Sequence, residues 1–198
     1  MSHILNKFRY FIYFFIGLVF CLFFTIIYFT FQLPDDSKLK NYKPDVMTRV
    51  HDSNGKLVKE YSKEYRIFIP VDNIPNNLKN AFISAEDKNF YNHYGIDPLG
   101  ILRALLKNTY YLFSNRRPEG ASTITQQVAK NFLLNDEVSI SRKAKEALLA
   151  IKIDATLSKS RILELYLNQI YLGSGTYGVA AASNRYFKKS LEELDFSE

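Results

Sequence analysis

The sequence predicts a mainly α-helical domain with a small β-hairpin, preceded by a single N-terminal transmembrane helix. Three observations predict this fold class. Residues 10–33 contain no charged side chain and are rich in Phe, Ile, Leu and Tyr. Asn54 and Gly55 separate two short segments that favour strands, and both are expected to have the positive φ angles of a tight hairpin turn. Beyond Pro75, apolar residues recur mainly at helical spacing, between residues that favour helix ends.

The uncharged span is long enough to cross a bilayer, because about 20 apolar residues suffice for a transmembrane helix. Lys7 and Arg9 precede it, so the positive-inside rule places the N-terminus in the cytoplasm. A cleaved signal peptide would need a shorter apolar region and a small-residue cleavage site, which this span lacks. We expect a single-pass type II signal anchor, with a cytoplasmic segment at 1–9, the membrane helix at 10–33, a linker at 34–48 and a domain at 49–198.

The charge balance favours partners that carry phosphate. The chain has a net charge of +6 and a pI of about 9.2, which suits nucleic acid, anionic lipid or a lipid-linked phosphate. Cys21 is the one cysteine of the sequence. The chain by itself can therefore build neither a disulfide framework nor a cysteine-based zinc site.

The first part of the domain predicts a small sheet rather than chemistry. Residues 49–61 are interpreted as the hairpin, and residues 65–71 as a further short strand that ends at Pro70. A helix is expected to begin after Pro75. This sheet would lead directly into the first helix that carries candidate catalytic residues.

Glu86 is the candidate chemical centre of that helix. At helical spacing the apolar stripe consists of Leu78, Phe82, Ala85 and Asn89. Glu86 lies on this stripe, between Phe82 and Phe90, so we expect its carboxylate to be partly desolvated. Desolvation would raise its pKa and suit it to proton transfer near neutral pH. The alternative is a helical glutamate that points into water.

Two further segments carry candidate binding surfaces. The apolar run from Pro98 to Phe113 contains Arg103 and Lys107, and is either a core helix or a segment that dips into the membrane interface. In residues 120–131, Ser122 and Thr123 are candidate helix caps. The helix that follows would present Thr123, Gln127 and Lys130 on one face, a set that suits sugar and phosphate oxygens. A solvated helix face is the alternative.

The last third of the sequence predicts three more helices. For residues 141–157 the expected buried stripe is Ala144, Leu148, Ile151 and Ala155. Arg142 and Glu146 are four residues apart there, and a surface ion pair is their simplest interpretation. Ser158 would cap the next helix, which carries Glu164, Asn168 and Tyr171. The final helix is expected from Ala180 to Phe187.

Taken in order, these segments resemble the five motifs of the glycosyltransferase domain found in class A penicillin-binding proteins and in monofunctional peptidoglycan transglycosylases. The first motif matches Glu86, Asp87, Phe90, His93, Gly95 and Asp97. The second matches Gly120, residues 122–127, Lys130 and Asn131, and the third matches Arg142, Lys143 and Glu146. The fourth and fifth match Lys159, residues 162–164, residues 166–168, Tyr171, Gly173, Tyr177, Gly178, Ala181, Ala182, Tyr186, Phe187 and Lys189.

The resemblance implies a lysozyme-like helical domain with a membrane-associated small lobe. It implies that lipid II is polymerised into glycan strands by inverting transfer, with release of undecaprenyl diphosphate. Glu86 would act as general base toward the 4-hydroxyl of the acceptor sugar, and Glu146 would orient Arg142 or a divalent cation. Lys130, Arg142 and Lys143 would hold the diphosphate. The other substrate-binding residues that it implies are Asp87, Phe90, His93, Ser122, Thr123, Gln126, Gln127, Asn131 and Tyr171.

The resemblance also implies a cofactor, partners and a location. Mg²⁺ suits a diphosphate leaving group, although the sequence contains no dedicated metal cage. The expected partners are lipid II, the growing glycan strand, membrane lipid and cell-wall synthesis proteins, and nucleic acid is not expected. The expected location is the bacterial inner membrane, with the domain on the extracytoplasmic side.

The sequence departs from the family pattern at Val138, where many members carry Arg. The domain of the family continues beyond the position of Glu198. Ser37 and Ser53 begin Ser-x-x-Lys matches in a linker and a turn, without the other transpeptidase elements, so we expect neither transpeptidation nor penicillin binding from this chain. Two other classes stay open: a lysozyme-like glycan hydrolase, which also uses paired carboxylates, and a non-catalytic membrane protein that binds lipid II or protein partners.

Overall fold

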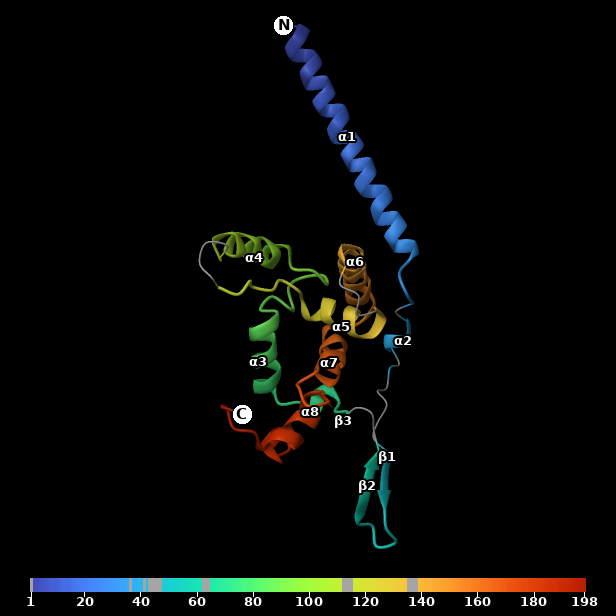
Figure 1. Cartoon of the computed structure of the whole chain (residues 1–198), viewed down its shortest axis with the longest axis vertical. Helices are drawn as coiled ribbons and strands as arrows, with labels where there is room; N and C mark the ends of the chain where they lie inside the picture. The colour runs from blue at the N-terminus through green and yellow to red at the C-terminus, as the bar shows by residue number, and fades with distance from the viewer. Residues whose placement is uncertain are drawn as a thin grey trace.

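The computed structural model describes residues 2–35, 37–40, 42, 48–61, 65–111, 116–134 and 139–198, and it is mainly helical, as predicted (Figure 1). Its helices are α1 (Ser2–Phe31), α2 (Ser37–Lys40), α3 (Asn76–Glu86), α4 (Pro98–Tyr111), α5 (Ile124–Leu133), α6 (Ile140–Thr156), α7 (Lys159–Gln169) and α8 (Val179–Ala182). Its strands are β1 (Thr48–His51), β2 (Leu57–Tyr61), β3 (Tyr65–Arg66) and β4 (Thr176–Tyr177). Single turns of 3₁₀-helix or π-helix occupy Val71–Asn73, Ser183–Phe187 and Leu191–Glu193.

The uncharged N-terminal span forms one continuous helix, α1, which projects away from the domain (Figure 1). Arg9–Phe31 has a mean hydropathy of 2.5, and none of its most apolar window is buried inside the protein. The helix also contacts α6, but most of its length has no protein packed around it, and it has the dimensions and the surface of a membrane span.

The segment that follows α1 is packed against the domain, although the sequence predicts a polar linker there. Leu39 is 1% exposed and belongs to the hydrophobic core. Nη2 of Arg161, in α7, donates to the carbonyl oxygens of Leu39 at 3.1 Å and Tyr42 at 2.8 Å. The Tyr42 ring meets Phe132 of α5 edge-on, with ring centroids 4.7 Å apart. The anchor is thus joined to the domain through packed residues.

The predicted hairpin is confirmed, and it lies at the end of the domain opposite α1 (Figure 1). Its turn differs in detail from the prediction. Gly55 has a positive φ of 77°, but Asn54 does not. Instead, Oδ1 of Asp52 accepts from the amides of Asn54 and Lys56, both at 2.9 Å. An aspartate that bonds the backbone two residues on is a recognised way to close a turn.

The strand predicted at 65–71 is shorter than expected, and the predicted small sheet with the hairpin is wrong. β3 covers only Tyr65–Arg66 and pairs in parallel with β4, from the far end of the chain. Beyond it, side chains of α7 replace a strand partner. Asn168 accepts from the amide of Ile69 and donates to its carbonyl, both at 2.8 Å. Oε2 of Glu164 accepts from the amide of Val71 at 2.9 Å.

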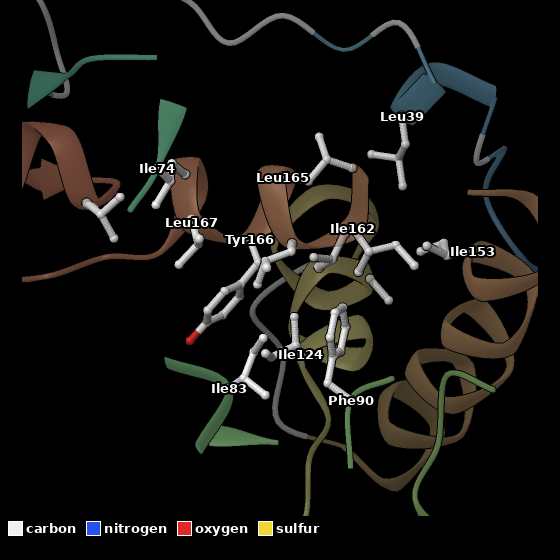
Figure 2. Packing of buried hydrophobic residues seen from close by; sticks show 14 of the residues in the cluster. Leu39, Ile74, Ile83, Phe90, Ile124, Ile153, Ile162, Leu165, Tyr166 and Leu167 are labelled. Carbon is white, nitrogen blue, oxygen red and sulfur yellow. The ribbon is translucent and has the colours of Figure 1, made fainter. Parts of the chain in front are cut away.

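The core is built where α5, α6 and α7 pack together (Figure 2). The helix α7 lies inside it, since most of its side chains from Ile162 to Asn168 are buried. Phe90, from the loop after α3, is fully buried among them. The predicted caps of two of these helices are confirmed: Thr123 caps α5 and Ser158 caps α7 through hydroxyls that accept backbone amides. The site helices are therefore fixed at their N-termini.

The predicted stripe of α6 is wrong, and that of α3 is confirmed only in part. In α6 the buried residues are Glu146, Leu149, Ala150 and Ile153, whereas Ile151 is 44% exposed and Ala155 is exposed. Several consecutive positions of α6 are apolar, so α5 and α7 select one of two neighbouring faces. In α3, Leu78 and Phe82 are partly buried and pack against the core, as predicted. Its buried residue is Ile83, however, while Ala85 is exposed and Asn89 lies beyond the helix, which ends at Glu86.

The helix α4 resolves the alternative left open for the apolar run. Gly100 and Ala104 are its buried residues. Its large apolar side chains are exposed: Leu99 72%, Leu102 53%, Leu105 62%, Leu106 65% and Tyr110 69%. The core-helix interpretation is wrong, and the exposed apolar face agrees with an interfacial segment. Residues 112 and 113 of the run lie outside the described residues.

Gly95 allows the loop after α3 to pass close to α6. Its φ is +82°, and a Cβ built there would lie 2.3 Å from the carbonyl oxygen of Ala150. We expect Gly95→Ala to cost about 2–5 kcal/mol in free energy of unfolding, of which about 1–2 comes from the left-handed backbone and the rest from overpacking. The matched control is Gly175→Ala, because Gly175 has a φ of +69° but open space around it. Urea unfolding of both variants tests this, and equal losses would contradict it.

Candidate active site

Glu86 is the last residue of α3, and its side chain is exposed. Nε2 of Gln127, in α5, donates to Oε2 of Glu86 at 2.8 Å. The expected burial of Glu86 between Phe82 and Phe90 is wrong. Because the helix ends there, the chain turns and Phe90 enters the core, while the Glu86 carboxylate stays at the rim of a cleft. One of its oxygens is oriented by Gln127, and the carboxylate is open to a substrate.

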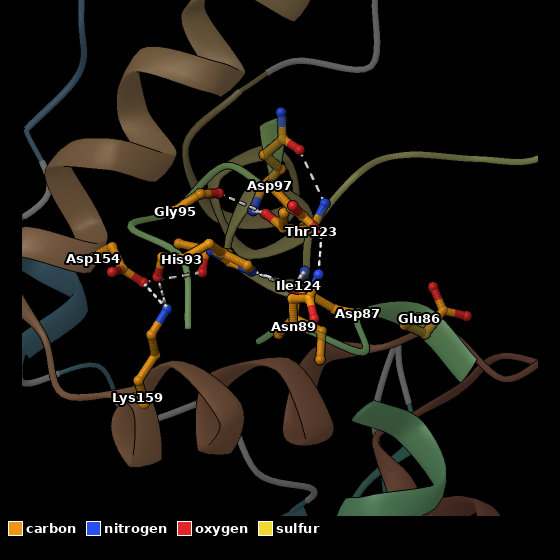
Figure 3. A network of polar contacts seen from close by, with 12 residues as sticks. Glu86, Asp87, Asn89, His93, Gly95, Asp97, Thr123, Ile124, Asp154 and Lys159 are labelled. Atoms are coloured by element: carbon orange, nitrogen blue, oxygen red, sulfur yellow. Dashed lines mark hydrogen bonds and ion pairs between the residues drawn. The ribbon is translucent and has the colours of Figure 1, made fainter. Parts of the chain in front are cut away.

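Asp87, the next residue, is buried and organises the loop that follows (Figure 3). Its Oδ2 lies 2.9 Å from Nε2 of His93 and accepts from the backbone amide of Ile124 at 3.0 Å. The hydroxyl of Thr123 donates to the carbonyl oxygen of Gly95 at 2.6 Å. These bonds fasten the loop after α3 to the N-terminus of α5, so Glu86 and the residues of α5 have fixed relative positions.

Lys159 holds the same loop from the side of α7 (Figure 3). Its Nζ donates to the carbonyl oxygen of His93 at 2.7 Å and pairs with Oδ1 of Asp154 at 2.6 Å. The same ammonium lies 4.9 Å from the centre of the Phe90 ring, a cation–π distance. The loop after α3 is thus bonded directly to α5 and α7 and, through Lys159 and Asp154, is linked to α6.

Thr123 and Gln126 form a capping box. The Thr123 hydroxyl accepts from the amide of Gln126 at 3.1 Å, and Oε1 of Gln126 accepts from the amide of Thr123 at 2.9 Å. Both side chains are buried. Their polar atoms are engaged within the protein, which differs from the exposed polar face predicted for Thr123. Gln127 and Lys130, from the same predicted face, do line the cleft.

Asp97 immediately precedes α4 and is also buried. Burial tends to raise the pKa of this carboxyl, but hydrogen bonds from the Gly100 amide and the Asn89 side chain outweigh burial and hold the pKa below its usual value. The Asn89 amide lies 3.0 Å from Oδ2. Asp97 is therefore a charged cap that fixes the start of α4 beside the cleft.

Glu146 is a buried carboxylate with two cationic partners. The predicted ion pair with Arg142 is confirmed, but Glu146 is 2% exposed, so the pair is not a surface pair as expected. Nη1 of Arg142 lies 3.0 Å from Oε2, and Nζ of Lys143 binds the other oxygen. Lys143 also donates to the Ser122 hydroxyl at 2.8 Å. A buried carboxylate needs such partners to offset its desolvation, and here it holds both cations at the edge of the cleft.

Tyr166 lies beneath the end of α3. Its ring packs edge-on against Phe82, with centroids 6.1 Å apart. Burial and, to a smaller extent, the charge of Glu86 raise the pKa of Tyr166. Its buried hydroxyl has no hydrogen-bond partner among the described residues. Tyr166 is thus a neutral side chain below the candidate base.

The cleft has two adjoining compartments, of about 390 Å³ and about 370 Å³. Glu86, Ser122 and Gln127 line both. The first compartment extends toward α4 and is also lined by Lys88, Arg103, Lys107 and Glu119. The second is also lined by Lys130, Asn131, Arg142, Lys143 and Glu146. An exposed carboxylate stands between two groups of cations, an arrangement that can accept a proton while anionic groups are held nearby.

The structure thus separates the predicted site residues. Glu86, Ser122, Gln127, Lys130, Asn131, Arg142, Lys143 and Glu146 come together around the second compartment. Asp87 and Thr123 lie in the wall of the first. Four do not line either compartment: Phe90, His93, Gln126 and Tyr171. Tyr171 lies beyond the end of α7 and packs against Tyr177, with ring centroids 5.1 Å apart.

Sequence reasoning missed Glu119 as a cleft residue. Its only signal in the sequence is its place just before Gly120, and no spacing pattern links it to its partners Arg103 and Lys107. Over the described parts of the chain, no group of three or more His, Cys, Asp or Glu side chains could hold a metal ion. The two Glu146 oxygens are already bound by cations, so Glu146 is a poor ligand for Mg²⁺.

Comparisons with known proteins show the family of the chain. The family model described as Transglycosylase matches residues 54–198. Penicillin-binding protein 1A of Rickettsia typhi is 54% identical over 173 residues, which cover 87% of this chain and 22% of the relative. Penicillin-binding protein 1A of Aquifex aeolicus is 45% identical over 187 residues, which cover 92% of this chain and 25% of the relative.

Penicillin-binding protein 1A of Escherichia coli is 46% identical over 167 residues, which cover 84% of this chain and 19% of the relative. The chain spans about a fifth to a quarter of the length of these relatives. The family match and the identities over most of the chain confirm the resemblance seen in the motifs. The chain therefore belongs to the transglycosylase family, and its domain is that of a protein like penicillin-binding protein 1A.

Proposed function

We propose that the chain is a peptidoglycan glycosyltransferase that joins lipid II units into glycan strands and releases undecaprenyl diphosphate. The observation that carries this proposal is the exposed Glu86 carboxylate at the boundary of two compartments, each with its own cations. Membership of the transglycosylase family supports it. The similarity to penicillin-binding protein 1A supports the same substrate class.

Glu86 would act as the general base. It takes the proton from the 4-hydroxyl of the acceptor GlcNAc while that oxygen attacks C1 of the donor MurNAc. The bond from C1 to the diphosphate oxygen breaks on the opposite face, so the configuration at C1 is inverted. The Gln127 amide, 2.8 Å from Oε2, would keep one oxygen oriented and leave the other for the proton.

The second compartment would hold the diphosphate as it leaves. Negative charge grows on the leaving oxygen, and Lys130, Arg142 and Lys143 would stabilise it there. Glu146 would keep Arg142 and Lys143 in place through its two oxygens. Ser122 and Asn131 would position sugar and phosphate oxygens. A cation such as Mg²⁺ enters this proposal only as a counter-ion that the diphosphate brings.

The site would work at a membrane surface. The helix α1 is apolar enough to anchor the chain, and the exposed leucines of α4 would rest in the interface. Substrate and product both carry a long isoprenoid chain, so both would stay in the bilayer. We propose a location in the bacterial inner membrane, type II, with the domain outside the cytoplasm. The partners would be lipid II, the growing strand, membrane lipid and other cell-wall synthesis proteins.

Substitutions of Glu86 and Glu146 should impair polymerisation in different ways. Glu86→Gln keeps the shape of the side chain but cannot accept a proton, so the rate should fall roughly 10²–10⁴-fold with little change in KM. Glu146→Gln removes a charged partner of Arg142 and Lys143, so the KM for lipid II should rise about 10- to 100-fold, with a lower Tm. Polymerisation of fluorescent lipid II in vesicles measures both effects.

The control for charge loss is Glu192→Gln, because Glu192 is exposed and lies outside both compartments. It should behave like the unmodified chain. Near-normal turnover by Glu86→Gln would contradict the base assignment. Soluble fragments released from purified peptidoglycan, without polymer formed from lipid II, would instead indicate a glycan hydrolase.

The exposed face of α4 can be tested with fluorescence, because the sequence contains no Trp. In the full chain in vesicles, Trp in Leu106→Trp should emit at shorter wavelength and be quenched by brominated lipid. Trp in Phe196→Trp should not be quenched, since Phe196 is fully exposed and the C-terminus, two residues further on, lies away from α4 (Figure 1). Equal quenching of the two variants, or none in Leu106→Trp, would contradict an interfacial α4.

The orientation of α1 can be tested with reporters fused after Glu198. A reporter that is active only in the cytoplasm should be silent, and one that is active only outside should give signal. Reversing the flanking charges with Lys7→Glu and Arg9→Glu should lower the outside signal. Strong cytoplasmic signal from the unmodified chain would overturn the type II orientation.

A further inference from the structure

The first compartment of the cleft contains a pair of cations that the proposed mechanism does not use. Arg103 and Lys107 lie one turn apart on α4, and both face the carboxylate of Glu119. Nζ of Lys107 is 2.7 Å from Oε2, and Nε of Arg103 is 3.6 Å from Oε1. Glu86 lines the same compartment. The candidate base therefore has one group of cations on each side.

Glu119 is held against this pair by its own backbone. Its amide donates to Oδ1 of Asn108 at 2.7 Å, and its carbonyl oxygen accepts from Nδ2 of Asn108 at 3.0 Å. A hydrogen bond from Lys107, together with the charges of Lys107, Arg103 and Lys88, holds the pKa of Glu119 below its usual value. The carboxylate thus occupies a site that favours anions.

The contact between these side chains can be exchanged. The side chains of Arg103 and Lys107 are 47% and 48% exposed, and that of Glu119 is 31% exposed. Ion pairs between exposed side chains contribute little stability. A diphosphate carries more charge and more acceptor oxygens than one carboxylate, and Arg can bind two phosphate oxygens at once. A diphosphate ligand should therefore compete with Glu119.

The reaction brings two diphosphates to this cleft. The donor loses its diphosphate, but an acceptor that is still lipid-linked keeps its own. The cation pair shares α4 with the exposed Leu102, Leu105 and Leu106. Cations beside an interfacial apolar face lie at the depth of lipid phosphates. A lipid whose tail lies beside these leucines would have its diphosphate next to Arg103 and Lys107.

We propose that Arg103 and Lys107 bind the diphosphate of the acceptor lipid, and that the Glu119 carboxylate occupies this site until the acceptor displaces it. The inference rests on the proposed function, because it assigns the two compartments to the two substrates. Arg103 and Lys107 act on acceptor binding, and Glu119 acts as an internal competitor for it. Removing Arg103 and Lys107 should therefore weaken binding of the acceptor, whereas removing the Glu119 carboxylate should strengthen it.

The test separates acceptor from donor with two lipid II analogues. One lacks the 4-hydroxyl of GlcNAc and can only donate. The other has CH₂ in place of the oxygen between C1 and phosphorus and can only accept. For the full chain in vesicles, Arg103→Gln with Lys107→Gln should raise the KM of the acceptor about tenfold or more and leave that of the donor unchanged. Glu119→Gln should lower the acceptor KM about two- to fivefold.

The matched control removes one Lys and one Arg away from the cleft, with Lys56→Gln and Arg185→Gln, and should leave both KM values unchanged. Both control residues are exposed. A higher acceptor KM in Glu119→Gln would overturn the inference and would indicate that Glu119 stabilises α4 instead of competing with the acceptor. An equal rise of both KM values in the double variant would also overturn it, and would indicate general attraction to lipid.

Binding of the accept-only analogue in nanodiscs is measured without turnover. Tighter binding by Glu119→Gln and weaker binding by the double variant would support the acceptor site even if the chain formed no glycan, which would count against the proposed function alone. Equal binding by the unmodified chain and both variants would overturn the acceptor site, even for a chain that polymerises.

Discussion

The buried carboxylate of Asp87 is the interaction on which the geometry of the cleft depends. Its Oδ2 lies within hydrogen-bonding distance of Nε2 of His93, in the same loop, and accepts a hydrogen bond from the backbone amide of Ile124, at the start of α5. Removing one partner of a buried charge costs about 3–5 kcal/mol, so the contacts of Asp87 strongly favour this one arrangement of the loop against α5. Because Glu86 is the residue before Asp87, the contacts of Asp87 also fix the position of the candidate base relative to α5.

The polar residues of the motifs fall into two groups with different physical roles. Asp87, His93, Thr123 and Gln126 are buried, and their polar atoms mostly bond the protein itself. Glu86, Gln127 and Lys130 face solvent in the cleft. Glu146 connects the groups, since it is a buried anion that presents exposed cations. Residues that share a motif therefore need not share contact with substrate.

Local features of the fold could be predicted from the sequence, because their causes are local. The hairpin at Gly55, the caps Thr123 and Ser158, and the start of α3 each follow from a few neighbouring residues. The buried face of α6 could not be predicted, because consecutive apolar residues allow two faces and only packing chooses. The parallel pairing of β3 with β4 depends on a partner far away in the chain. The contact of Glu119 with α4 lies closer in the chain, but no spacing pattern in the sequence indicates it.

Glu86 lines the cleft, but the environment predicted for its carboxylate was wrong. Periodicity places Glu86 on the stripe of α3 only if the helix continues, and the helix ends at that residue. Beyond the end of a helix, helical spacing no longer predicts which side chains are buried. A side chain at the end of a helix can therefore point away from the core. The expectation of a desolvated carboxylate failed for this reason, while the motif still identified the residue at the cleft.

The packed junction after α1 restricts how the domain can move above a bilayer. A flexible linker of about 15 residues would let the domain wander by roughly 20 Å. Instead, the side chain of Arg161 donates hydrogen bonds to the carbonyl oxygens of Leu39 and Tyr42, close to the end of α1. These contacts limit how far α1 can move relative to the domain. With α1 in a bilayer, as proposed, they would keep the cleft near the membrane surface, and a lipid-linked substrate of the proposed kind would reach it by lateral diffusion in two dimensions.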